Sequence, residues 1–125
     1  MNDLRSLPSE IQQLLSAWDR FFHAWWLFHY TLGIAGTIAS ITVASNPKIL
    51  QGCPHVIDSL AWMSAICIAL ITFLMPSRRA KAYVAAWRLL NDACNRYKLD
   101  PTYPVQELLN AATKGEEIIS SADPT

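Results

Sequence analysis

The sequence is short of charge. Charged residues make up 16% of its 125 residues and hydrophobic residues 52%, and its ten basic and ten acidic side chains cancel. Soluble domains carry about 25% charged residues, and proteins that bind nucleic acid through a broad surface have a basic excess. The composition therefore predicts no nucleic-acid partner, and it supplies few polar side chains for the surface of a soluble domain.

The sequence also lacks the motifs of common enzymes. It has no P-loop and no GxGxxG, HExxH or GxSxG motif, and nothing resembles a nucleophile paired with a base. The three cysteines, Cys53, Cys67 and Cys94, form no CxxC pair and no zinc-ligand spacing. We therefore predict no enzyme, no catalytic or metal-binding residue, no cofactor and no disulfide framework.

Two long runs have no Asp, Glu, Lys or Arg: residues 21–44 and residues 59–75. As a helix the first run reaches ~36 Å, more than the ~30 Å hydrocarbon core of a bilayer, and the second lies at the lower limit for a span. The connecting residues include Pro47, Gly52 and Pro54, which favour a turn. The predicted fold is an all-α membrane protein, a two-helix transmembrane hairpin within a single domain of residues 1–125. Its first span is predicted at 21–44, its outer loop at 45–58 and its second span at 59–76.

Two other interpretations of the runs are a soluble helical bundle with a buried hairpin and a cleaved signal peptide. Each run is apolar around its whole circumference, and so short a chain has little material to cover both. The first run also exceeds a usual signal-peptide core, and the segment before it is not basic. We therefore expect both runs to stay in the mature protein and to face lipid.

The basic residues lie unevenly about the two runs. Arg5 and Arg20 precede the first run, seven Lys and Arg residues follow the second, and only Lys48 lies between the runs. Basic residues are retained on the cytoplasmic side of membranes. We therefore predict a multi-pass protein of the cell inner membrane with both termini in the cytoplasm.

The flanking segments are predicted to form cytoplasmic amphipathic helices at 8–20, 78–98 and 104–119, because apolar residues recur in them at helical spacing. Arg78, Arg79 and Lys81 are predicted to meet anionic headgroups at the membrane surface. The apolar faces of these helices can pack on each other, on another copy or on a partner.

Small residues mark one face of the first run. Gly36, Ser40 and Ala44 are spaced by four, and the second run has Ala61, Ala65 and Ala69 at the same spacing. This pattern lets transmembrane helices approach closely, and a polar residue at membrane depth, such as His29, usually faces protein or water. The residues predicted to pack helices or to line a pore are His29, Gly33, Gly36, Ser40, Ala61, Ala65 and Ala69. The spacing leaves open whether they close the hairpin or join separate copies, which would make a homo-oligomer.

Residues after the second run carry a family resemblance that covers nearly the whole chain. They are Pro76, Ala80, Tyr83, Ala86, Leu90, Tyr97, Leu108, Ala111, Gly115, Glu116 and Ile118. With the order of the predicted elements, these residues resemble the SLATT families, the SMODS- and SLOG-associating two-transmembrane effectors of bacteria.

The resemblance implies a membrane effector of a bacterial conflict or antiphage (antiviral) system. Such an effector acts as an oligomeric pore or ion channel, or disrupts the membrane, when a nucleotide-sensing or nucleotide-synthesising partner triggers it. The residues themselves leave a second interpretation open, a non-conducting membrane adaptor that binds another membrane protein. Cys53, in the predicted outer loop, is either a free thiol or a cross-link between two copies.

Overall fold

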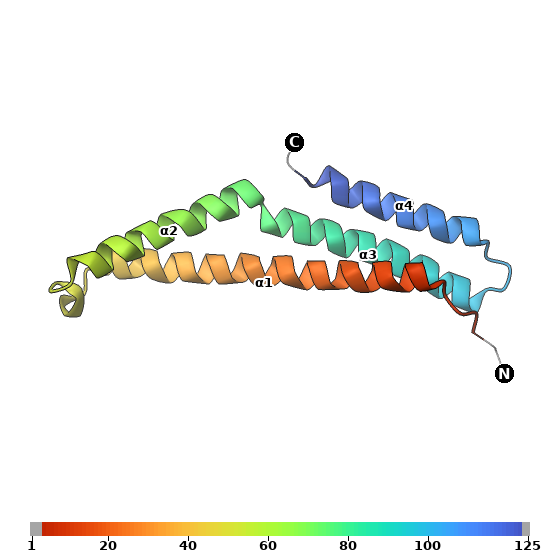
Figure 1. The fold of residues 1–125 in the computed structure, drawn as a ribbon, viewed down its shortest axis with the longest axis horizontal. Coiled ribbons are helices and arrows are strands. Elements are labelled where there is room, and N and C mark those ends of the chain that lie inside the picture. Colours follow the sequence, from red (N-terminus) through yellow and green to blue (C-terminus); the bar gives the residue numbers. More distant parts are fainter. Residues whose placement is uncertain (1–3, 124–125) are drawn as a thin grey trace. The chain divides into compact units, whose positions relative to one another are not determined.

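The computed structural model describes residues 4–123, and this part of the chain contains only helices (Figure 1). Four α-helices, α1 to α4, and the short 3₁₀ helix η1 at Lys48–Leu50 follow one another, with no strand among the described residues. This confirms the predicted all-α class.

The helices form two compact units. The hairpin unit is Trp26–Pro76, and the bundle unit combines Met1–Trp25 with Ser77–Thr125. Lys48 and Asp58 are the only charged residues of the sequence between 26 and 76. The division therefore follows the composition, because apolar helices and amphipathic helices bury different kinds of surface.

Helix α1, Ser9–Ser45, is continuous and belongs to both units. It begins where the amides of Ile11 and Gln12 donate to the carbonyl of Pro8, at 3.1 and 3.2 Å. It ends before Asn46, whose φ of 41° leaves the right-handed helical region.

Helix α2, Pro54–Leu74, begins earlier than the predicted start of the second span at residue 59. The outer loop of 45–58 is correspondingly too long as predicted. Proline suits the first turn of a helix, since its fixed φ is already helical and its missing N–H has no partner to lose there. The residues that follow Pro54 continue the helix, and the hydroxyl of Ser59 donates to the carbonyl of His55 at 2.7 Å.

A sharp stop separates α2 from α3, which spans Pro76–Leu99. Met75 adopts φ 44° and ψ 54°, the left-handed conformation, and its amide donates to the carbonyl of Ile71. Pro76 then opens α3, before the predicted start at residue 78. Helix α4, Val105–Ser121, begins one residue after the predicted position and ends two residues beyond it.

The bundle unit has a compact apolar core made by the first half of α1 with α3 and α4. Its small residues let the helices approach closely, because a Cβ added at Gly115 would lie 2.7 Å from Cζ3 of Trp18 and 3.4 Å from Cβ of Ala86. The core residues are Ile11, Trp18, Ala86, Leu90, Ala93, Cys94, Tyr97, Leu108, Ala111 and Ala112.

The segment before α1 is tied to the loop between α3 and α4. The guanidinium of Arg5 donates to the carbonyls of Pro101 and Tyr103, at 3.2 and 3.1 Å. It also lies over the ring of Tyr97, 4.2 Å from the centroid. These contacts hold the N-terminal segment against the rest of the bundle unit.

Two helices are long and apolar enough to cross a membrane: α1, and the stretch Pro54–Leu99 that contains α2. Only 11% of the apolar window of each is buried, whereas the core helix of a soluble protein is mostly buried. The exposed residues include Ile34, Ile38, Trp62, Ile66 and Phe73. A single copy of the chain therefore leaves most of this apolar surface uncovered.

Candidate helix-packing site in the hairpin unit

The two helices of the hairpin unit pack along matching faces. On α2 all the buried and half-buried residues except Leu70 are spaced alternately by three and four, and on α1 the face follows the same spacing. This is the pattern of side chains that interlock between two long helices. The α2 face consists of Ile57, Leu60, Ser64, Cys67, Ile71 and Leu74, and the α1 face includes Leu32, Gly36, Ala39 and Val43.

Gly36 marks a close approach of α1 to α2. A Cβ at this position would lie 3.0 Å from Cβ of Cys67, which is closer than side chains normally pack. The absence of a side chain therefore sets the distance between the two helices, as small residues do at interfaces between transmembrane helices.

Two hydroxyl groups connect the helices next to Gly36. Ser40 and Ser64 form a hydrogen bond, and Oγ of Ser64 lies 3.4 Å from the carbonyl oxygen of Gly36. When Ser64 donates to that carbonyl, Ser40 donates to Ser64. Because apolar surroundings offer no water as a substitute partner, such a bond both satisfies buried polar atoms and selects one register of the two helices.

The predicted packing residues divide between two environments. Gly36 and Ser40 lie in the contact between α1 and α2, whereas a Cβ at Gly33 would meet nothing within 4 Å. Ala61, Ala65 and Ala69 are exposed on α2. Within one copy of the hairpin these three alanines therefore lie outside the buried face of α2.

Ser64 and Cys67 are the two buried residues of α2, and the sequence pattern did not identify them. Both are buried, with 8% and 6% of their surface exposed. The spacing of four and three residues from Leu60 through Ser64 and Cys67 to Ile71 is the sequence pattern that indicates this packing face. The repeat of Ala61, Ala65 and Ala69 indicates a different face of the same helix.

His29 lies among aromatic rings in the hairpin unit. Its ring centroid is 6.0 Å from that of Trp26 and 5.7 Å from that of Tyr30, in edge-on arrangements. Its Nδ1 is shielded and has no hydrogen-bond partner among the described residues. His29 is thus held by aromatic contacts, and neither serine of the hairpin contact bonds to it.

The three basic residues predicted for the membrane surface differ in their contacts. Arg79 lies over the ring of Trp25, 5.0 Å from its centroid, and forms an ion pair with Asp123 at 3.5 Å. Arg78 donates to the carbonyl of Ser121 at 3.3 Å. Lys81 is exposed and has no ion-pair partner within residues 4–123. Two of the three basic side chains therefore hold the end of α4 against the start of α3.

The cysteines occupy separate environments and are all unbonded. Cys53 is exposed in the loop before α2, and Cys67 and Cys94 are buried. Burial raises the pKa of the Cys94 thiol, although nearby Lys98 acts in the opposite direction. Among residues 4–123 no group of three His, Cys, Asp or Glu side chains is arranged to hold a metal ion.

Comparisons with protein-family models, with curated proteins and with solved structures give no match. Several residues that carry the family resemblance are buried: Ala80, Ala86, Leu90, Tyr97, Leu108, Ala111 and Gly115. These positions pack the bundle unit, so the resemblance concerns helix packing and remains a hypothesis about function.

Proposed function

We propose that this chain is an integral membrane protein whose hairpin unit crosses the bilayer twice. The lengths of its helices support this. Residues 26–45 of α1 and the 21 residues of α2 each reach ~30 Å as a helix, which matches the ~30 Å hydrocarbon core. Lys48 and Asp58, the charged residues of this unit, lie in the loop and in the first turns of α2, near the ends of both helices.

We place both flanks of the hairpin on the cytoplasmic side. The segments before and after the hairpin belong to one compact unit, so a double crossing brings them to the same side. That unit carries every Lys and Arg residue of the sequence except Lys48. The excess of basic residues supports a cytoplasmic bundle unit and an outer loop that contains Cys53.

The proposed activity is that of a self-assembling membrane effector, an oligomeric pore or membrane-disrupting protein under the control of a partner. The observation that carries it is the uncovered apolar surface of the hairpin unit. Only 11% of the apolar window of each helix is buried in one copy of the chain. Two helices enclose no lumen, so conduction requires several copies, most simply in closed symmetry. The resemblance to SLATT proteins adds an antiphage role and a nucleotide-sensing or nucleotide-synthesising partner to the proposal.

Expression of the chain alone in bacterial cells, with a dye that reports membrane potential, tests this activity. Depolarisation is expected, and Gly36→Leu should abolish it because the larger side chain cannot fit against Cys67. The matched control is Gly52→Leu in the outer loop, where a Cβ would meet nothing within 4 Å. Gly52→Leu should depolarise the cells like the wild type.

An effector that stays closed without its trigger would not depolarise the cells. For such an effector, the size of the purified protein in mild detergent tests the proposal. A discrete homo-oligomer larger than a dimer supports the proposal whether or not the cells depolarise. A monomer in the membrane fraction that leaves the membrane potential unchanged contradicts it.

The second candidate function is a non-conducting adaptor, and one observation favours it. The hydroxyls of Thr37, Thr42 and Thr72 donate to carbonyls of their own helices, at 2.7, 2.8 and 2.8 Å. They present little free polarity to a water-filled path. An adaptor predicts a monomer or dimer that co-purifies with a second membrane protein and leaves the membrane potential unchanged.

A further inference from the structure

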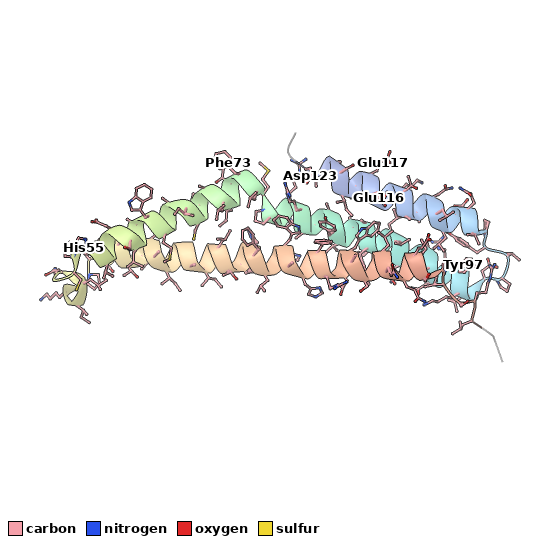
Figure 2. All side chains as sticks on the ribbon, viewed as in Figure 1. His55, Phe73, Tyr97, Glu116, Glu117 and Asp123 are labelled. Atoms are coloured by element: carbon pink, nitrogen blue, oxygen red, sulfur yellow. The ribbon has the colours of Figure 1, made fainter. Side chains whose placement is uncertain are left out.

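A groove opens between α1 and α4 in the bundle unit, above the side chain of Tyr83 from α3. It encloses about 320 Å³. Phe21 on its α1 side stacks on Tyr83, with ring centroids 5.5 Å apart, and is half exposed. The opposite side carries the carboxylates of Glu116 on α4 and of Asp123 just after α4, which are both labelled in Figure 2. The residues that define this acidic groove are Leu14, Trp18, Phe21, Tyr83, Glu116 and Asp123.

The other side of the same unit carries a basic stripe of Lys81, Ala85 and Arg88, all exposed on α3. At ~100° per residue these three lie within ~60° of one another and roughly 140–160° around α3 from Tyr83. The stripe and the groove therefore face opposite directions. Neither Lys81 nor Arg88 has an ion-pair partner within the described chain, and the same holds for Glu116.

The charges of the two surfaces are in register along the unit. The close approach of Gly115 to Ala86 places Glu116 near the level of Arg88, and the ion pair of Arg79 with Asp123 places Asp123 near the level of Lys81. Because α3 and α4 run in opposite directions, Glu116 is displaced from Arg88 and Asp123 from Lys81 in the same direction along the unit. Each displacement amounts to ~3–5 Å. The long side chains of Arg88 and Lys81 span this offset, so between two copies at the same level Arg88 can reach Glu116 and Lys81 can reach Asp123.

We propose that the acidic groove of one copy receives the basic stripe of a second copy, head to tail in the plane of the membrane. The inference rests on the proposed membrane function, because a common tether to the bilayer holds neighbouring bundle units level. The small side chain of Ala85 lets α3 approach the groove, where Arg88 meets the unpaired carboxylate of Glu116 and Lys81 approaches Asp123 beside its ion pair with Arg79. Because the two surfaces differ, each copy can bind two neighbours, and the contact closes into a ring when the rotation permits.

Charge complementarity selects a second copy as the occupant. The first half of α3, as far as Arg88, carries only basic residues, whereas α4 after Lys114 carries only acidic ones. Opposite charges steer such surfaces together and like charges across an interface are strongly unfavourable. A lipid surface is the competing partner of the basic stripe, but anionic headgroups would leave Glu116 without a counter-charge.

Cross-linking in membranes is the first test. In a Cys53→Ser background, where Cys67 and Cys94 are buried, the pair Arg88→Cys with Glu116→Cys is treated with a short bis-maleimide. A ladder of covalent oligomers is expected, since the two positions face opposite directions within one copy. Chains with Arg88→Cys alone mixed with chains with Glu116→Cys alone should stop at dimers. The matched control pair, Arg88→Cys with Glu107→Cys, should yield at least about tenfold less product.

Charge reversal is the second test, with oligomer size in mild detergent as the readout. Arg88→Glu and Glu116→Arg should each lower the oligomeric fraction, and the double variant should restore it. An equal mixture of the two single variants should also assemble, because each supplies the intact surface that the other lacks at alternate contacts.

The outcomes separate this interface from the proposed function. A wild-type monomer that leaves the membrane potential unchanged, together with no ladder from the double-cysteine variant, overturns both. An oligomer that forms no ladder, and whose size is unchanged by either charge reversal, overturns the interface alone. Cross-linked dimers from Arg88→Cys without Glu116→Cys indicate a two-fold contact and also overturn the interface. An Arg88→Glu variant that loses binding to anionic vesicles while its oligomer persists assigns the stripe to lipid and also overturns the interface.

Discussion

Two glycines control close helix contacts in this protein, one in each unit. Gly115 admits the ring of Trp18 in the bundle unit, and Gly36 admits Cys67 in the hairpin unit. In both cases the missing Cβ sets how near two helices come. Glycine otherwise weakens a helix by about 1 kcal/mol relative to alanine, so its presence at these positions is best explained by packing.

Gly115→Ala should destabilise the bundle unit. The new Cβ would fall within 2.7 Å of Cζ3 of Trp18, and Trp18 is a buried ring that packs in the core. Overpacking of this kind costs about 1–3 kcal/mol, which exceeds the gain in helix propensity. Thermal unfolding followed by tryptophan fluorescence measures the effect, and Thr113→Ala on the exposed side of α4 is the control. Superimposable unfolding curves for Gly115→Ala and wild type would contradict the close contact.

Asp100 should titrate at a lower pH than a free aspartate. The hydroxyl and the amide of Thr102 donate to its Oδ1, at 2.6 and 2.8 Å, and both bonds lower the pKa of Asp100. Since the folded pKa is depressed, the stabilisation is present above the ordinary value of about 3.9 and is lost as the pH falls through the folded pKa.

The ¹³C chemical shift of the Asp100 carboxyl, followed by NMR as the pH is lowered, measures this titration. Thr102→Val removes the hydroxyl, which is the largest cause of the shift, and should move the midpoint up toward the ordinary value. The hydrogen bond from the backbone amide of residue 102 remains, so part of the lowering of the Asp100 pKa should persist. An ordinary midpoint in the wild type would refute the assignment.

At the scale of elements, the sequence predicts each helix but misjudges two helix boundaries. Apolar runs and helical spacing locate α1 to α4 because those patterns act locally. The start of α2 at Pro54 was missed because proline was interpreted as a turn signal, although it also suits a first helical turn. The end of α2 before Met75 depends on a left-handed backbone conformation at that residue. Methionine rarely adopts this conformation, so the sequence does not predict it.

The packing face of α2 shows what one-dimensional patterns leave undecided. Ala61, Ala65 and Ala69 form a regular stripe of small residues, yet the hairpin contact uses Ser64 and Cys67. Both stripes have helical spacing, and which one meets α1 depends on the register of two helices. Gly36 and Ser40 were identified on α1 because glycine and serine are distinctive there among larger side chains.

The serine pair should couple α1 and α2 energetically. A double-mutant cycle of Ser40→Ala and Ser64→Ala should give a coupling of about 0.6–2 kcal/mol, the range of hydrogen bonds between transmembrane helices. Equilibrium unfolding in mixed detergent micelles provides the four free energies of unfolding. Thr37→Ala with Thr72→Ala is the matched control, because both hydroxyls bond within their own helices. Equal coupling in the two cycles would contradict a bond between the helices.

At the scale of the whole molecule, composition separates two environments along one chain. The apolar hairpin unit contains two charged residues, and the amphipathic bundle unit contains the rest. The sequence predicts the two apolar helices well, since length and hydropathy suffice for that. It does not predict a separate bundle unit, because the choice between self-packed and partner-bound amphipathic faces depends on contacts between distant segments.

The most direct test of the account is the side of the membrane on which Cys53 lies. Right-side-out and inverted vesicles are treated with a membrane-impermeant maleimide, using the chain with Cys67 and Cys94 replaced by alanine. A second variant carries Ser121→Cys and Cys53→Ser in the same background, which moves the thiol to the exposed end of α4. A hairpin that crosses the membrane twice, with its bundle unit in the cytoplasm, predicts labelling of Cys53 in right-side-out vesicles and of the α4 thiol only in inverted ones. Labelling of both thiols from the same side, or recovery of the chain in the soluble fraction, would contradict a hairpin that crosses the membrane twice.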